Sequence, residues 1–186
     1  MKLSNRYQYY VLCEDAQTRS FINSVLTEQG INARKVRFNN IPCGEGCGEA
    51  AVRRGISKEV KRLRATRYIS STLIVCTDAD NHKVDERISI LVNEVEKEIG
   101  KWDRLKEPII MWIPKLQIET WIHFLDEEAV DEEMRFPHSG KPVSCKKQAR
   151  LFSEYCQDLK ELDCTKIGSI AEAKKEYKRV CELQSS

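Results

Sequence analysis

The chain has 186 residues and a formal net charge of +2, with 31 Lys and Arg residues against 29 Asp and Glu residues. Hydrophobic residues make up 41% of it, and it has only eight glycines and five prolines. This composition excludes collagen-like, low-complexity and mostly disordered chains, and the balanced charge excludes a histone-like polycation. A chain of this length suits one domain, with room for a small appendage.

Strand-like and helix-like patterns alternate along the first two-thirds of the chain. Aromatic or continuous apolar runs predict strands, and apolar residues at helical spacing predict helices. Strands are expected at residues 7–13, 33–38, 71–77 and 108–113, and helices at residues 18–29, 50–67, 84–99 and 119–125. This order predicts an α/β fold, in which a parallel β-sheet of about four strands is flanked by helices.

The pattern changes after residue 126. An acidic stretch and a loop follow, and then two amphipathic helices are expected at residues 146–159 and 169–183. We therefore divide the chain into an α/β domain at residues 1–126 and an acidic loop with a C-terminal helical extension at residues 127–186. The extension is expected to pack on the same domain.

The cysteines and the lengths of the apolar segments bear on the cellular compartment in which the protein is expected. Eight cysteines invite a disulfide interpretation. The chain does not begin with the apolar stretch of a secretory signal, however, and a chain of this length needs no disulfides. No window approaches the roughly 18 consecutive apolar residues of a membrane span. We therefore expect a cytoplasmic protein with reduced thiols and no membrane partner.

Acidic residues follow three of the predicted strands. Glu14 and Asp15 come after the first strand, Asp78 and Asp80 after the third, and Glu119 after the last. The carboxyl ends of parallel strands meet at one edge of a sheet, where the functional groups of open α/β sheets gather. We therefore expect these carboxylates to lie close together.

Clustered carboxylates repel one another and raise one another's pKa, so such a site favours a bound cation. Oxygen ligands without His or Cys favour Mg²⁺ or Mn²⁺ over Zn²⁺. In a continuing strand, residues i and i+2 point to the same side, so Asp78 and Asp80 are expected to share one metal. The alternative is structural, because an Asp-x-Asp after a strand is also common as a turn or a helix cap.

Two segments of the chain, YQYYVLCED and STLIVCTDAD, resemble the two motifs of the Toprim domain, which topoisomerases, bacterial primases and OLD-family nucleases share. The order of strands, helices and acids also fits the Toprim topology, and the resemblance covers residues 6–125. It implies a Rossmann-like sheet in which Glu14 is the general acid or base. It also implies that Asp78 and Asp80, together with Glu14, bind Mg²⁺ or Mn²⁺.

The later segment WIPKLQIETWIHFL resembles small stand-alone Toprim-like proteins, which are often linked to phage-defence or restriction loci. In OLD-like nucleases a further Glu helps to bind a second metal. The resemblance implies that role for Glu119, with Asp15 assisting. Asp15 also stands where many Toprim members have Gly, and His82 lies in a segment that often holds another Gly. These departures suit the defence-type branch better than primases or topoisomerases.

A glycine-rich loop and a basic helix precede the third strand. The segment CGEGCGE at residues 43–49 can cradle a phosphate through the backbone N–H groups of Gly46 and Gly48, but it lacks the Lys-Ser/Thr of a P-loop. Cys43 and Cys47 have no second nearby pair for zinc. The helix carries many cations and a single acid, which predicts contacts with a nucleic-acid backbone, a solvated face being the alternative. The candidate contacts are Arg53, Arg54, Lys58, Lys61, Arg62 and Arg64.

Together these features predict a metal-dependent nuclease that hydrolyses phosphodiester bonds in DNA, or alternatively in RNA, within a phage-defence or restriction-type system. The rival hypothesis is a non-catalytic Toprim module for binding and assembly that acts with an ATPase partner. A nucleotidyl transferase is a third interpretation, but no separate nucleotide-binding element is evident. The sequence leaves homo-oligomerisation open.

Overall fold

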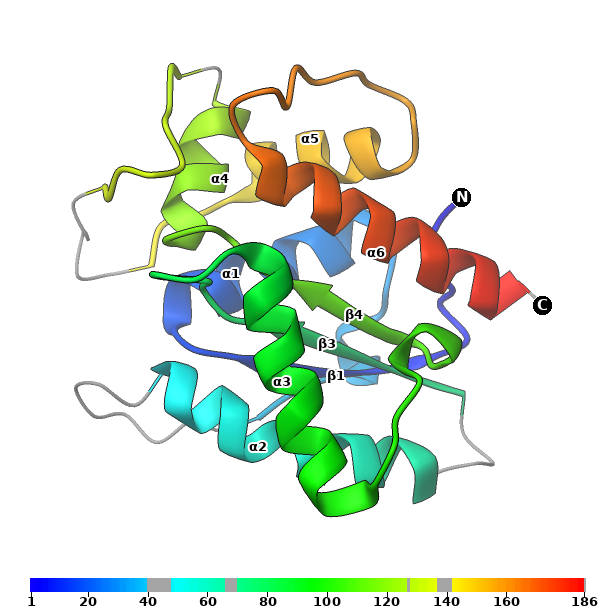
Figure 1. Ribbon diagram of the computed structural model, residues 1–186. Helices are drawn as coiled ribbons and strands as arrows, with labels where there is room; N and C mark the ends of the chain where they lie inside the picture. The colour runs from blue at the N-terminus through cyan, green and yellow to red at the C-terminus, as the bar shows by residue number, and fades with distance from the viewer. Residues whose placement is uncertain (40–47, 66–69, 127, 137–141, 186) are drawn as a thin grey trace.

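The computed structural model describes residues 1–39, 48–65, 70–126, 128–136 and 142–185. It confirms the expected α/β architecture, with a four-stranded parallel sheet between helices that is consistent with a Rossmann-like fold (Figure 1). The strands are β1 (Gln8–Cys13), β2 (Val36–Phe38), β3 (Ser71–Cys76) and β4 (Ile109–Trp112). The α-helices are α1 (Ala16–Glu28), α2 (Gly48–Ala65), α3 (Val84–Ile99), α4 (Ile118–Leu125), α5 (Lys146–Cys156) and α6 (Gly168–Ser185). Two 3₁₀ turns, η1 (Ala33–Lys35) and η2 (Arg104–Lys106), precede β2 and β4.

The strand order β2-β1-β3-β4 places the two longest strands in the middle of the sheet, and every pair is parallel. Cys13 pairs with Cys76, and Cys76 pairs with Trp112, so β1, β3 and β4 end level with one another. From β1 the chain leads to β2 on one side, whereas from β3 it leads to β4 on the other. In open α/β sheets ligands bind at such a reversal point, and the acids that follow β1 and β3 lie there.

The central strands are buried on both faces of the sheet. Tyr9, Val11 and Cys13 belong to an apolar cluster with α1, α4, α5 and α6, whereas Tyr10 and Leu12 belong to a second cluster with α2 and α3. Side chains alternate along a strand, so each face of β1 supplies one of these clusters. Figure 1 shows the two sets of helices on opposite sides of the sheet. The continuous apolar runs in the sequence are therefore strands covered on both faces.

The two C-terminal helices share a core with the sheet. The ring of Phe152 in α5 stacks on Trp121, with 5.7 Å between centroids, and meets Trp112 of β4 edge-on at 5.2 Å. Trp112 also donates a 3.3 Å hydrogen bond from its indole N–H to the carbonyl of Ala173 in α6. These contacts attach α5 and α6 directly to the strand at the edge of the sheet.

An ion-pair network on α6 covers the open edge of β4. Glu176 accepts hydrogen bonds from the backbone N–H of Met111 (3.3 Å) and from the guanidinium of Arg104 (2.9 Å). Arg179 donates to Glu176 (3.0 Å) and to the carbonyl of Ile109. An edge strand otherwise presents a row of unpaired N–H and C=O groups. The side chains of α6 therefore take the place of a fifth strand.

Several element boundaries differ from those expected: for example, α1 begins at Ala16 rather than at residue 18, and α5 ends at Cys156 rather than at residue 159. The strand expected at residues 33–38 is reduced to three residues, because Asn32 accepts a 2.9 Å hydrogen bond from the N–H of Arg34 and starts the turn η1. The basic helix begins at Gly48 rather than at residue 50. Most of the glycine-rich loop, including Gly46, lies outside the described residues.

The described part of the chain holds six free cysteines, five of them buried. Burial raises the pKa of Cys13 to about 12 and raises that of Cys76 as well, so neither thiol is a reactive thiolate at neutral pH. No helix within the described ranges is long and apolar enough to cross a membrane.

We expect the substitution Glu176→Gln to lower the free energy of unfolding by about 2–4 kcal/mol, because it leaves Arg104 and Arg179 largely buried without their counter-charge. Glu172→Gln on the same helix removes an exposed ion pair with Lys175 and should cost no more than about 0.5 kcal/mol. Urea denaturation followed by circular dichroism measures both losses. Equal losses in the two variants would show that the network does not stabilise the edge of β4.

Candidate functional site

Glu14 and Asp78 meet at the carboxyl ends of β1 and β3. One carboxylate oxygen of Glu14 accepts hydrogen bonds from the hydroxyl of Thr77 and from the backbone N–H of Asp78. Both donors belong to the segment that follows β3, so the side chain of Glu14 reaches across from one strand end to the next. The predicted meeting of Glu14 with the Asp-x-Asp segment is therefore present in the structure.

Burial and mutual repulsion raise the pKa of both central acids. Burial is the largest cause for Glu14, and the charges of Asp15 and Asp80 add to it, although hydrogen bonds from Thr77 and Asp78 oppose the rise. For Asp78 burial again comes first, followed by the charges of Glu14, Asp15, Asp80 and Glu119. The other four acids predicted from the sequence therefore all act electrostatically on Asp78, as clustered carboxylates do.

The first residue of α2 lies directly against Glu14. A Cβ atom at Gly48 would stand 2.9 Å from the Oε2 atom of Glu14 and 3.0 Å from its Cβ atom. Only glycine permits so close an approach without a shift of Glu14. The first N–H groups of a helix lack intrahelical partners and carry partial positive charge. The positive end of α2 thus lies beside the carboxylate of Glu14.

The backbone turns sharply at Asp80. Asp80 has a left-handed conformation with φ of 54°, and the preceding residue, Ala79, donates its N–H to the carbonyl of Pro114 at 2.8 Å. Strand β3 has already ended at Cys76. The expectation that Asp78 and Asp80 share one side of a continuing strand is therefore wrong, because the strand does not continue through them.

Two arginines, neither of them among the sequence candidates, contact the carboxylate of Asp80. The Nη2 atom of Arg135 lies 2.7 Å from Oδ1, and the Nη2 atom of Arg87 lies 3.7 Å from Oδ2. Arg87 is buried, forms a 2.6 Å ion pair with Glu49 at the start of α2, and donates to the carbonyl of Ala79 at 3.2 Å. Its Nε atom is buried and has no hydrogen-bond partner among the described residues. Arg87 therefore ties the start of α2 to the turn at Asp80.

The sequence contains a pattern from which a functional or structural role of Arg87 could have been predicted, and it contains none for Arg135. Arg87 occupies the apolar face of α3, one turn before the buried Leu91, and a charged residue at such a position needs a buried partner. Arg135 lies in an irregular segment, where its partner depends on tertiary contacts alone.

Asp15 and Glu119 flank the central pair. Asp15 caps α1, since one of its oxygens accepts from the N–H of Thr18 (2.7 Å) and the other from the hydroxyl of Thr18 (3.0 Å). A cation at Asp15 would have to share the carboxylate oxygens with this cap. Glu119 lies half-buried in the first turn of α4, where its charge acts on Asp78. Within the described ranges, no group of three or more His, Cys, Asp or Glu side chains is arranged as a metal-ligand set.

The cations of α2 fall into two groups. Arg53, Lys61 and Arg64 form ion pairs with acids outside the helix, namely Glu94, Glu98 and Glu107. Arg62 covers the ring of Tyr10, with 4.2 Å to the ring centroid. Arg54 and Lys58 are exposed and form no ion pair with any residue that the structure describes. Much of the positive charge of the helix is thus offset by α3, and Arg54 and Lys58 are the candidates best placed to meet a polyanion.

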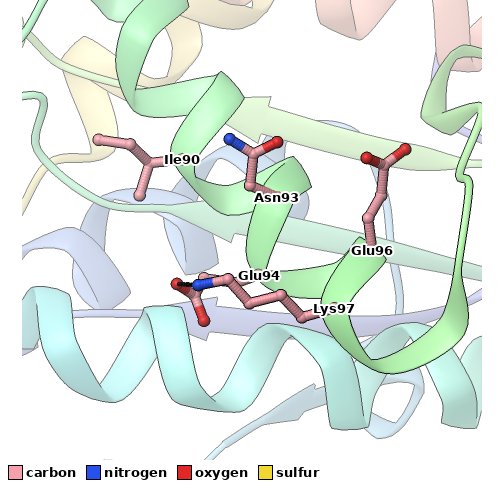
Figure 2. Close-up of a pocket in the computed structure, with 5 residues that line it drawn as sticks. All are labelled: Ile90, Asn93, Glu94, Glu96 and Lys97. Atoms are coloured by element: carbon pink, nitrogen blue, oxygen red, sulfur yellow. Dashed lines mark hydrogen bonds and ion pairs between the residues drawn. The ribbon is translucent and has the colours of Figure 1, made fainter.

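A shallow surface depression lies elsewhere, along the outer side of α3 (Figure 2). It is lined by Ile90, Asn93, Glu94, Glu96 and Lys97. All five residues belong to a single helix, and Glu94 and Lys97 are paired with each other at 2.7 Å. None of them follows a strand end, so the depression is separate from the carboxylate site.

No protein-family model, no curated protein and no solved structure matches this chain.

The raised pKa of Asp78 predicts how stability depends on pH. An acid whose pKa is higher in the folded than in the unfolded state binds more protons when folded, so the contribution of Asp78 to the stability of the wild type falls as the pH rises above about 4. Asp78→Asn removes this penalty. We expect the variant to gain melting temperature relative to the wild type at pH 8 and to gain less at pH 5, with about 2–4 °C for each kcal/mol.

Thermal melts at the two pH values, without divalent cations, measure this difference. Glu161→Gln serves as the control, because it removes an exposed carboxylate and should change the melting temperature equally at both pH values. A loss of stability in Asp78→Asn that is the same at pH 5 and pH 8 would mean that Asp78 is not strained by burial and repulsion.

Proposed function

We propose that this protein is a divalent-metal-dependent nuclease that hydrolyses phosphodiester bonds in nucleic acid, with DNA expected before RNA. The observation that carries the proposal is the link between Glu14 and the segment of Asp78 at the reversal point of the sheet. Two acids with raised pKa values meet there, where open α/β sheets place their functional groups. The exposed cations of α2 support a polyanionic substrate.

The proposal includes membership of the Toprim superfamily, in its stand-alone branch linked to phage defence or restriction. The two segments that resemble Toprim motifs contain β1 and β3, and their acids follow these strands. The order of elements from β1 to β4 agrees with the one that the resemblance implies. A phosphodiesterase role in the cytoplasm agrees with this assignment.

The donor set of the site fits Mg²⁺ or Mn²⁺ by its chemistry, because in the part of the chain that the structure describes it consists of carboxylate oxygens, without His or Cys. Glu14 and Asp78 would hold the ion, and Glu119 would assist. Asp80 would join them once its carboxylate is released from Arg135. The ion would supply charge stabilisation at the phosphate that is cut. The carboxyl of Glu14, whose pKa is raised by burial, would take or give the proton as general acid or base.

A second candidate function is a non-catalytic module that binds an ATPase partner. The observations that favour it are the engagement of Asp80 by Arg135 and the use of Asp15 as a helix cap, which leave fewer oxygens for a cation. Calorimetric titration with Mn²⁺ separates the two functions, because the module requires no metal binding at millimolar concentration.

Glu14→Gln and Asp78→Asn should each reduce Mn²⁺- or Mg²⁺-dependent cleavage of DNA or RNA by about 100-fold or more, since each removes a charge at the reacting centre while preserving side-chain shape. Cleavage of labelled single-stranded and double-stranded substrates measures the effect, and circular dichroism confirms that the variants fold. Glu161→Gln should cut at the wild-type rate. Wild-type rates in both site variants would disprove the assignment of the site.

The cations of α2 give a separate prediction. Arg54→Ala and Lys58→Ala should each weaken nucleic-acid binding and lower the slope of log affinity against log salt by about 1, since each removes one phosphate contact. Lys61→Ala is the matched control, because Lys61 is paired with Glu98, and its effect should be smaller. Fluorescence anisotropy over a range of salt concentrations measures the slopes. An equal effect of all three substitutions would point to general charge rather than to this surface.

A further inference from the structure

The segment at residues 128–136, here called the strap, follows α4 (Figure 1). Its two ends are held by side-chain contacts. At its start, Glu128 lies 2.8 Å from the Nδ1 atom of His123. At its end, the ring of Phe136 stacks on the ring of His123, with 4.3 Å between centroids and 16° between planes. Gln117 also donates a 3.1 Å hydrogen bond to the carbonyl of Phe136. Both ends of the strap are thus attached to α4 and the turn before it.

The middle of the strap is held by two further contacts. Glu132 accepts a 2.7 Å hydrogen bond from the hydroxyl of Ser169 at the start of α6. Glu133 lies 3.4 Å from the ammonium of Lys115, which also donates to the carbonyl of His82 at 3.2 Å. The strap is therefore attached to the same turn that carries Asp80, and its path over the site is set by contacts on several elements.

This path delivers Arg135 to Asp80. The two side chains form a 2.7 Å ion pair, in which the side chain of Arg135 is 61% exposed and that of Asp80 is 35% exposed. Arg87 approaches the other carboxylate oxygen of Asp80 from the buried side. An exposed ion pair is weak and exchanges readily, whereas the buried Arg87 is built into the fold. Arg135 is therefore the exchangeable one of the two counter-charges.

We propose that Arg135 is a positioning residue that competes with the divalent cation for the carboxylate of Asp80. The strap places the guanidinium of Arg135 against the carboxylate oxygen of Asp80 that the cation would coordinate. Arg135 and the cation therefore exclude each other at Asp80. Binding of the cation releases Arg135 from Asp80, and the strap thereby sets the metal affinity of the site. This inference rests on the proposed function, because it presumes that the carboxylates bind a cation.

The test is Mn²⁺ binding, measured by the electron paramagnetic resonance signal of free Mn²⁺ in titrations of the full chain. The variant is Arg135→Gln. The matched control is Arg150→Gln on α5, because Arg150 has the same side-chain exposure, 62%, loses the same charge and is paired with Glu154 far along the chain from the site acids. Thermal melts check that both variants remain folded.

Arg135→Gln should bind Mn²⁺ about three- to fivefold more tightly than the wild type, because a fold-change of this size corresponds to the free energy of a well-formed exposed ion pair. Arg150→Gln should remain within about 1.5-fold of the wild type, since its charge is screened. If Mn²⁺ binds the wild type but Arg135→Gln binds it no more tightly than Arg150→Gln does, competition at Asp80 is disproved and the proposed function stands. If neither the wild type nor Arg135→Gln binds Mn²⁺ at millimolar concentration, both the inference and the proposed function are overturned.

Discussion

The hydrogen bonds from Thr77 and the N–H of Asp78 to the carboxylate of Glu14 join the ends of the two central strands, and the geometry of the site depends on them. They form because the register sets Cys13 beside Cys76, so that the next residues of β1 and β3 emerge level. The same register brings a second acid beside the first in a partly buried setting. The carboxylates of the site therefore repel one another, and the rest of the fold must offset this repulsion.

Three features offset that repulsion, and each comes from a different part of the chain. The positive end of α2 rests on Glu14 through Gly48, the buried guanidinium of Arg87 faces Asp80 from α3, and the strap adds Arg135 from the solvent side. The sheet beneath them is stabilised from its far edge, where Glu176 and Arg179 form hydrogen bonds with free backbone groups of β4. The C-terminal helices thus maintain the strand whose end leads to Glu119.

The sheet and its central acids could be predicted from the sequence because both depend on local pattern. Apolar runs mark β1 and β3, and a Glu or an Asp directly after such a run must emerge at the sheet edge. The turn at Asp80 could not be predicted, since the end of β3 and the left-handed backbone depend on the contact of Ala79 with Pro114. The cap on α1 was not predicted, although an Asp directly before the first turn of a helix is a common N-cap.

Tertiary pairing explains the remaining differences. The basic helix has a single acid between its cations in sequence, yet Lys61 and Arg64 find Glu98 and Glu107 on neighbouring elements. The residues of α2 do not determine which helix packs beside it. The number of its cations that remain unpaired and available to a ligand therefore could not be predicted from the sequence. The pairing of Arg135 with Asp80 could not be predicted for the same reason, because it depends on tertiary contacts.

The most direct measurement of the central claim is an anomalous difference map from crystals of the protein soaked in MnCl₂. A divalent cation held by the strand-end acids predicts an anomalous peak bonded to the carboxylate oxygens of Glu14 and Asp78, at the roughly 2.0–2.3 Å typical of hard divalent cations with oxygen ligands. The absence of a peak there from a well-soaked crystal, or a peak confined to other residues, would contradict the account.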